Sequence, residues 1–498
     1  MKETSQMQRG LKNRHLQMIA LGGAIGTGLF YGSASTISLG GPSVIAAYLI
    51  CGIVIFLIMR MLGEMAVEEP VSGSFSYYAD KYWGPFPGFM LGWNYWFSYV
   101  IISMAELTAV GIYVHYWLPD LPQWVTALVC LMAITCLNLV NVRAYGETEF
   151  WMSFIKVAAI LGMIALGAWL ICQDSRPFPQ NFSNLWDYGG VLPNGIWGFC
   201  LAMVTVIFSF GGVELIGITA GEAENPERSL PKAINQIIWR ILVFYIGTMV
   251  VIMSLWPWNQ IGTQNSPFVQ IFTNVGFPAA ANLLNFVVLA AAISVYNSAI
   301  YGNSRIAYGL AEEGNAPQWF KKLSSRGVPV HTLCLCSGLT LFVVAVTYFF
   351  PGKIFMYFLS LTVGATIINW VTIIVTHLKF KTYCQKTGKT TKFPSLWYPA
   401  ADYFCLAFLC FIVLMMTQMP DMLTAVLIMP VWLAILWCCW RRLAPAPMSN
   451  TTHKSVPLLL TPVGSEDDFD GIYYKKGSCY ARNWRDSASD LHDSFGSS

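Results

Sequence analysis

The segment from Met18 to Leu39 reads MIALGGAIGTGLFYGSASTISL and determines the fold that the sequence predicts. It is apolar and long enough to cross a bilayer, for which about 20 residues suffice. Its middle nevertheless carries glycines at positions 22, 23, 26, 28 and 32, and a glycine costs about 1 kcal/mol relative to alanine inside a helix. Around Gly26-Thr27-Gly28 the backbone N–H groups have almost no side chain in front of them. We therefore expect a membrane helix that is broken at its centre to hold a ligand.

The whole chain is too apolar for a soluble protein. Of its 498 residues, 55% are hydrophobic and 11% are charged, whereas a soluble domain has roughly 25% charged residues. Apolar runs of about 18 or more residues indicate transmembrane helices. We predict about twelve, near residues 18–38, 42–62, 86–114, 124–142, 150–172, 196–220, 238–257, 279–304, 333–350, 354–377, 400–418 and 422–440. The predicted fold class is an all-α integral membrane protein.

The basic residues indicate the orientation, because Lys and Arg next to transmembrane helices stay cytoplasmic. They gather on alternate loops, whereas the other set of loops carries only Arg176 and Lys353. Both termini are therefore expected in the cytoplasm. Since topology explains the basic residues, the net charge of +3 gives no reason to expect nucleic acid as a partner.

A second glycine-interrupted segment lies near the middle of the chain. The run FSFGGVELIGITAG from Phe208 to Gly221 places Gly211-Gly212 directly before Glu214. An odd number of helices separates the two segments, so they cross in opposite directions, which indicates a transporter with inverted repeats and a midplane site. The predicted parts are a cytoplasmic N-terminus at 1–17, a first repeat at 18–172, a second repeat at 196–377, two further helices at 400–442 and a disordered polar tail at 443–498.

Two ionisable side chains lie inside predicted helices. A carboxylate at membrane depth costs about 2.5–3.5 kcal/mol, so Glu106 is expected to face the bundle interior or a cavity. It either ties helices together or handles substrate or protons. Lys156 lies two turns from the cytoplasmic end of its helix. Its ammonium either snorkels to the interface or is buried and carries or gates a proton.

Motifs for enzymatic chemistry are missing from the sequence. It has no HExxH, no P-loop and no GxSxG elbow. The histidines lie at or beyond the ends of predicted helices or in the tail, so no central histidine site is expected. The cysteines show no paired CxxC spacing and are interpreted as small hydrophobic residues. We predict no enzyme activity, metal or cofactor, and a secondary transporter is favoured over a channel.

Longer motifs resemble a known family. They are LGGAIGTGLFYGSA at 21–34, GEMAVEEPVSGSF at 63–75, GWNYW at 92–96, AELTA at 105–109, YGETEFWMSFIKV at 145–157, FSFGGVELIGITAGEAENPE at 208–227, SVYNS at 294–298 and RGVPV at 326–330. Over about residues 9–442 the chain resembles the amino acid permeases of the amino acid, polyamine and organocation superfamily. Within that family it most resembles the bacterial aromatic amino acid and phenylalanine permeases.

This resemblance implies a fold and an activity. The fold would be a five-plus-five inverted repeat with two further helices, and the activity proton-coupled import of an amino acid across the bacterial inner membrane. Aromatic amino acids are the expected substrates. Histidine, proline or another neutral amino acid, or a non-transporting amino acid sensor, are the alternatives. The expected partners are the amino acid, protons and the lipid bilayer.

The resemblance also implies how the substrate is bound. Its α-carboxylate would meet backbone N–H groups around Gly26, Thr27 and Gly28, because free N–H groups and the positive end of a half-helix attract an anion. Its α-ammonium would meet carbonyl groups freed by the two breaks, at Ala24, Ile25, Phe208 and Gly211. The pocket for its side chain would be formed by Met104, Glu106, Phe208, Phe210 and Tyr296. Lys156 and Glu214 are the candidates for proton coupling or gating.

Overall fold

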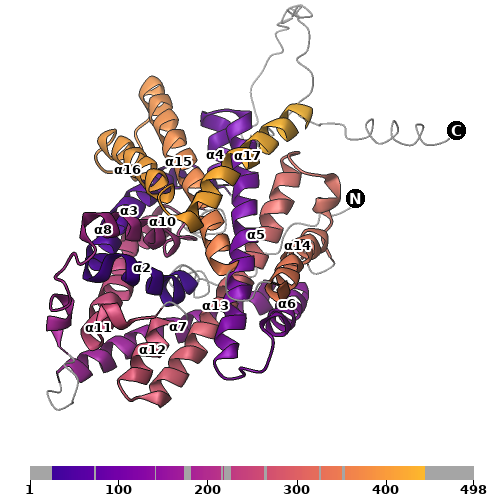
Figure 1. Cartoon of the computed structure of the whole chain (residues 1–498). Coiled ribbons are helices and arrows are strands. Elements are labelled where there is room, and N and C mark those ends of the chain that lie inside the picture. The colour runs from indigo at the N-terminus through magenta and orange to yellow at the C-terminus, as the bar shows by residue number, and fades with distance from the viewer. Residues whose placement is uncertain are drawn as a thin grey trace, which may run out of the picture. The chain divides into compact units, whose positions relative to one another are not determined.

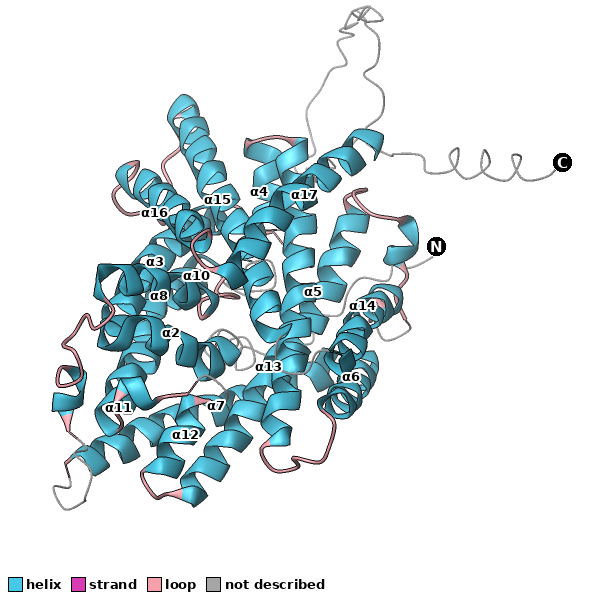
Figure 2. Cartoon of the chain, in the orientation of Figure 1, coloured by secondary structure: helices cyan, strands magenta, loops and turns pink. Residues whose placement is uncertain are grey.

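The computed structural model describes residues 25–71, 74–140, 142–172, 181–214, 217, 226–262, 266–324, 327–349 and 354–443. Within these ranges every regular element is a helix, as Figure 2 shows. The prediction of an all-α protein is therefore confirmed.

The helices follow one another without long gaps. In the first half they are η1 (Gly28–Gly32), α2 (Ser33–Gly40), η2 (Gly41–Ser43), α3 (Val44–Glu68), α4 (Ser74–Tyr82), α5 (Pro85–His115), α6 (Gln123–Val140), α7 (Val142–Ile171) and η3 (Phe182–Leu185). In the second half they are α8 (Gly195–Phe208), α10 (Pro226–Arg240), η5 (Ile241–Gly247), α11 (Thr248–Leu255), η6 (Trp258–Gln260), α12 (Pro267–Asn274), α13 (Pro278–Glu312), η7 (Gln318–Lys321), α14 (Val330–Phe349), α15 (Ile354–Thr387), α16 (Ala400–Met416) and α17 (Pro420–Leu443). One compact unit ends at Leu436 and a second begins at Trp437. The site described below belongs to the first unit.

Nine stretches among the described residues are long and apolar enough to cross a membrane, judged by length and composition. They are Gly28–Glu68, Pro85–His115, Gln123–Val140, Tyr145–Ile171, Pro226–Leu255, Pro278–Glu312, Val330–Phe349, Ile354–Thr387 and Pro420–Leu443. Two further apolar helices, α8 and α16, are shorter. The first stretch joins two predicted helices, which meet at Gly41, where φ is +56°. Twelve separate crossings therefore remain a prediction.

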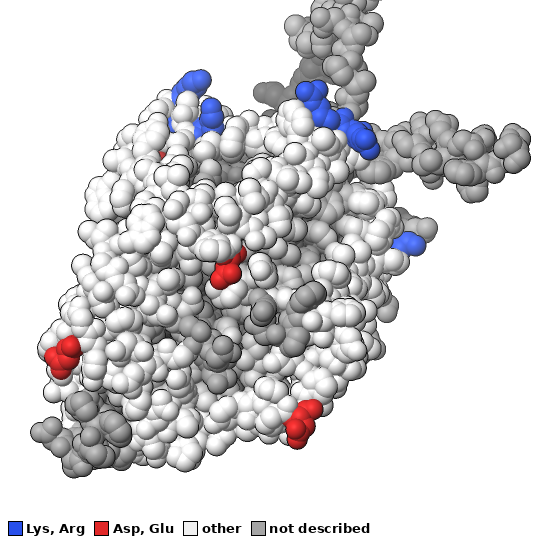
Figure 3. Space-filling view, in the orientation of Figure 1, with Lys and Arg blue, Asp and Glu red and all other residues white. Residues whose placement is uncertain are grey.

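The outer faces of several helices carry large apolar side chains. Strongly exposed examples are Val129, Trp151, Ile196, Leu283 and Phe342. On the face shown in Figure 3 most of the surface is uncharged, and Lys and Arg side chains gather at the outer end of α15. Soluble proteins rarely expose apolar patches of this extent, whereas lipid solvates them and basic side chains stay next to the membrane. The surface is thus that of a membrane protein.

α5 forms the centre of the packing. α13 and α15 pack along it, and α4 and α6 pack against its other sides, as Figure 1 shows for α13 and α6. α5 is apolar on all sides, and almost all of it from Ser98 to Tyr113 is buried, as expected for a helix that neighbours surround. In a second group, α3 packs against α8 and α10, and α2 packs against α8. The two segments in which the sequence predicts backbone breaks lie where these two groups of helices meet.

A buried polar cluster joins α3 to α15 and α16. The Glu64 carboxylate accepts hydrogen bonds from His377 Nε2 at 2.9 Å and Lys381 Nζ at 2.8 Å, and His377 Nδ1 lies 2.5 Å from Oδ1 of Asp402. Because carboxylates only accept hydrogen bonds, both ring nitrogens of His377 donate, and the ring is an imidazolium when both carboxylates are ionised. The expectation that this histidine lies at a helix end is wrong, since α15 continues to Thr387.

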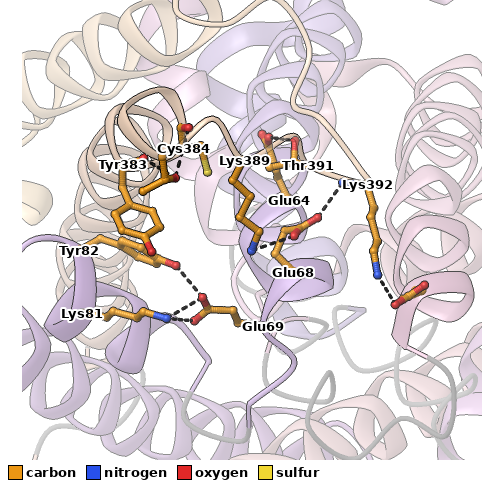
Figure 4. Close-up of polar contacts among 12 residues, drawn as sticks. Glu64, Glu68, Glu69, Lys81, Tyr82, Tyr383, Cys384, Lys389, Thr391 and Lys392 are labelled. Carbon is orange, nitrogen blue, oxygen red and sulfur yellow. Dashed lines mark hydrogen bonds and ion pairs between the residues drawn. The ribbon is translucent and has the colours of Figure 1, made fainter.

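Glu68 and Glu69, at the end of α3, bind side chains of neighbouring segments, as Figure 4 shows. Glu68 forms an ion pair with Lys389 at 3.0 Å. Glu69 faces α4, where Lys81 Nζ lies 2.6 Å and the Tyr82 hydroxyl 2.8 Å from its Oε1. Burial alone would raise the pKa of Glu69, but the hydrogen bonds from Lys81 and Tyr82 outweigh it and hold the pKa below its usual value. This end of α3 is therefore held by charge as well as by packing.

Candidate functional site

The first predicted break falls at the start of the described residues. Ile25 and Gly26 are not helical, and the helix starts at Thr27, directly before η1. Thr27 is fully buried, and its hydroxyl donates a hydrogen bond of 2.8 Å to Oε1 of Glu106 on α5. The positive end of this helix therefore has a carboxylate beside it. Ala24, the other predicted residue here, lies outside the described residues.

The second break follows α8. The helix ends at Phe208, and residues 209–214 form turns. Gly212 has a φ of +91°, a backbone conformation that glycine adopts at little cost and other residues avoid. The carbonyl of Phe208 accepts the Gly211 N–H at 3.1 Å, which leaves one lone pair for another donor. The helix thus stops three residues before the Gly211-Gly212 pair at which the sequence predicts an interruption.

The two breaks lie against each other. A Cβ atom added to Gly28 would lie 2.7 Å from the Cα of Ser209 and 3.1 Å from Cδ1 of Phe208. A Cβ atom added to Gly26 would lie 2.9 Å from Cγ2 of Val295 on α13. Close approach rather than an unusual backbone angle therefore requires these glycines. A side chain at Gly28 would push the two segments apart, and one at Gly26 would press on the Val295 side chain.

A cavity opens beside these two segments. The breaks and the faces of α5, α13 and α15 contribute its lining, which comprises Gly26, Gly28, Tyr99, Ile102, Glu106, Phe208, Ser209, Gly211, Gly212, Val295, Ser298 and Thr362. The lining combines glycine backbone, apolar and aromatic side chains and the Glu106 carboxylate. Few polar groups in a mostly apolar cavity are typical of a small-molecule site.

Five residues predicted from the sequence line this cavity, namely Gly26, Gly28, Glu106, Phe208 and Gly211. The sequence analysis missed Tyr99 and Val295, which also line it. Tyr99 could have been found from its position two turns before Glu106 on the same face of α5. Val295 comes from a helix far away in the sequence, and no local pattern marks it.

Other predicted residues do not line the cavity. Phe210 packs its ring against Tyr48 and Tyr245, with ring centroids 6.1 and 5.0 Å away. Met104 and Tyr296 are buried in the hydrophobic core. Glu214 is buried at the end of the second break, 2% exposed. Its coupling role remains a prediction.

Lys156 is fully buried, so the interpretation that it snorkels to the interface is wrong. Its ammonium donates hydrogen bonds to the carbonyl of Ile25 at 3.2 Å and to the hydroxyl of Ser294 at 2.9 Å. The Ser294 hydroxyl in turn donates to Oε1 of Glu149 at 2.5 Å. The lysine thus touches the first break. Its link to Glu149 was missed, although the seven-residue spacing places both side chains on one face of α7.

Known proteins are similar to the part of the chain that contains this cavity. The sequence profile described as "Amino acid permease" matches residues 15–442, which include every residue that lines the cavity. The chain is 51% identical over 431 residues to the aromatic amino acid transport protein AroP of Escherichia coli (strain K12), covering 86% of this chain and 94% of that protein. It is 50% identical over 431 residues to AroP of Salmonella typhi, with the same coverage. It is 45% identical over 438 residues to YtnA of Bacillus subtilis (strain 168), described as an uncharacterized amino acid permease, covering 87% of this chain and 95% of that protein.

Proposed function

Because this chain belongs to the amino acid permease family, we propose that it is a secondary transporter that imports aromatic L-amino acids together with protons. The aromatic preference is supported by the transport activity named for the relatives in Escherichia coli and Salmonella typhi. The observation that carries the proposal is the cavity, whose lining combines glycine backbone with aromatic and apolar side chains.

The lining of the cavity suits both the charged α-groups and the ring of an aromatic amino acid. The α-carboxylate binds near Gly26 and Gly28, where the positive end of a helix favours an anion. The α-ammonium binds the Phe208 carbonyl and the Glu106 carboxylate. We leave Ile25 out of this set, because its carbonyl already accepts a hydrogen bond from Lys156.

The aromatic ring of the substrate packs between side chains of both helix groups. Tyr99 and Phe208 offer rings, which favour edge-to-face or offset contacts with another ring. Ile102 and Val295 offer apolar surface at the same cavity. An aliphatic side chain would lose the ring contacts, so we expect phenylalanine, tyrosine and tryptophan to compete with one another for this site.

The proton is carried by buried ionisable groups beside the substrate. Lys156 joins the Ile25 carbonyl to a buried carboxylate network and is the first candidate for coupling. Glu214, at the end of the second break, is the candidate for gating. Replacing Lys156 by alanine should leave substrate binding intact and remove accumulation driven by a pH gradient.

We propose the membrane topology that the sequence predicts. Two inverted repeats at 18–172 and 196–377 place the two breaks in antiparallel helices, and residues 400–442 add two helices. Both termini face the cytoplasm of a bacterial inner membrane, because the basic loops alternate along the chain.

Uptake by purified protein in proteoliposomes tests the proposal. Labelled phenylalanine, tyrosine and tryptophan should accumulate when the outside is more acidic than the inside, and each should inhibit uptake of the others. If none of the three accumulates or competes, the aromatic assignment is wrong. Competition by histidine or proline alone would indicate another neutral substrate, and binding without flux would indicate a sensor.

A further inference from the structure

A hydrogen-bonded chain of three buried side chains leads away from the proposed substrate site. Lys156 Nζ donates to Ser294 Oγ at 2.9 Å, and Ser294 Oγ donates to Glu149 Oε1 at 2.5 Å. All three residues are 0% exposed. The single hydroxyl hydrogen of Ser294 is committed to the carboxylate while its lone pair accepts from the ammonium, so the chain has one direction.

The two ends of this hydrogen-bonded chain contact different residues. Lys156 also contacts the Ile25 carbonyl at 3.2 Å, at the edge of the first break. Glu149 lies seven residues earlier in α7, and its Oε1 reaches the same Ser294 hydroxyl that Lys156 contacts. Its Oε1 also accepts from Ser153 at 3.3 Å, and its Oε2 lies 3.5 Å from Nδ2 of Asn297. The chain therefore connects the Ile25 carbonyl with the side chains of Ser153 and Asn297.

We propose that Glu149 and Ser294, together with Lys156, form the proton relay of this transporter, an inference that rests on the proposed proton coupling. In the relay step the Nζ–H bond of Lys156 breaks as a new Oγ–H bond forms on Ser294. The original Oγ–H bond breaks as an Oε1–H bond forms on Glu149. The ammonium becomes an amine, the carboxylate becomes a carboxylic acid, and the total charge stays the same. The step needs no co-reactant.

Such a relay changes the charge beside the first break. While Lys156 is an ammonium, the Ile25 carbonyl accepts a charge-assisted hydrogen bond, which is roughly twice as strong as a neutral one. When the proton has moved to Glu149, the donor is a neutral amine and this contact weakens. A further proton that then binds to Lys156 gives the three residues a net positive charge and restores the contact. Proton binding is thus transmitted to the segment that we propose holds the substrate.

Few other ionisable groups surround the relay in the described part of the chain. Glu106 on α5 interacts electrostatically with Lys156, and Tyr145 on α7 with Glu149. α13 and α6 present amides, since Asn138 donates to Asn297 at 2.8 Å. α11 carries no ionisable residue. Tyr245 of η5 is turned elsewhere, as its hydroxyl donates to the Ser209 carbonyl.

The test separates proton movement from substrate movement. The full-length protein is reconstituted in vesicles that contain a pH-sensitive dye, and labelled phenylalanine is the probe. Exchange of external for internal phenylalanine reports binding and alternation without net proton transfer, whereas the dye reports substrate-driven proton entry. The variants are Glu149→Gln, Ser294→Ala and Ser294→Thr. The matched control is Ser153→Ala, which removes another hydroxyl from Glu149 without touching the link between Glu149 and Lys156.

We expect Glu149→Gln and Ser294→Ala to lower proton entry and gradient-driven accumulation by about 100-fold or more, the scale of a lost acid–base group, while exchange continues. Ser294→Thr should retain coupling, and Ser153→Ala should behave like the unmodified protein. Normal accumulation in Ser294→Ala or Glu149→Gln would overturn the relay, as would an equal loss in Ser153→Ala. Loss of exchange together with accumulation would assign both residues to holding the site together and would also overturn it. If the unmodified protein moves no proton with phenylalanine, the proposed function itself fails.

Discussion

Gly28 offers the sharpest test of the close contact between the two backbone breaks. In the variant Gly28→Ala the new Cβ atom would lie 2.7 Å from the Cα of Ser209, about 0.8 Å inside the ~3.5 Å at which carbon atoms pack. The φ of Gly28 is not positive, so alanine is disfavoured here by space alone. The contacted atom is the Cα of Ser209, which cannot rotate away as a side chain could. The segments around Gly28 and Ser209 must therefore separate. Overpacking of this kind costs about 1–3 kcal/mol.

Because the same two segments are proposed to bind the substrate, the separation should reduce transport more than it reduces folding. A displacement of about 1 Å in a substrate site costs about 100-fold in rate, so we expect initial phenylalanine uptake to fall about 10- to 100-fold per inserted molecule. The assay is uptake into proteoliposomes, with thermal unfolding in detergent measured in parallel.

The matched control is Gly162→Ala in α7, where an added Cβ meets nothing within 4 Å. That variant should transport normally and lose no stability, because alanine favours a helix. Normal uptake by Gly28→Ala, with an unchanged KM, would refute the reasoning that contact between the breaks shapes the site. Equal losses in both variants would refute it as well, since they would point to a general effect of the added methyl group.

Three further predictions concern other parts of the protein. His377→Ala leaves Glu64 and Asp402 buried without their shared donor, so we expect a loss of about 3–5 kcal/mol in thermal unfolding measurements; an unchanged melting temperature would contradict the bridging role. Glu214→Gln should reduce uptake while membrane insertion stays normal, and unaffected uptake would remove Glu214 from the coupling mechanism. The lowered pKa of Glu69 means that its contribution to stability is complete above the ordinary glutamate pKa of about 4.3 and is lost as the pH falls through the lower folded value. The protection of α4 against hydrogen exchange should therefore fall on acidification in the unmodified protein and change less in Lys81→Met, which lacks the main cause of the lowered pKa. Equal acid sensitivity would argue against this ion pair.

Local pattern was enough to predict the apolar, helical character of the protein and two glycine-rich segments that border the cavity. Apolar runs predict helices because lipid forces the backbone to satisfy its own hydrogen bonds. The glycines near positions 28 and 211 stand out because they cluster within apolar runs. Glu106 stands out for a similar reason, since a carboxylate inside an apolar run must face the protein interior. These features depend only on neighbours along the chain.

The tertiary structure decided which of these features meet. Phe208 and Phe210 are equally plausible in the sequence, yet only Phe208 lines the cavity, because the turn after α8 directs Phe210 toward Tyr48 and Tyr245. The partners of His377 come from α3 and α16, and its burial depends on where α15 ends. The link from Lys156 to Glu149 runs through Ser294 of α13. Such contacts join helices that are more than a hundred residues apart in several cases, and no periodicity within one helix can determine which neighbour packs against it.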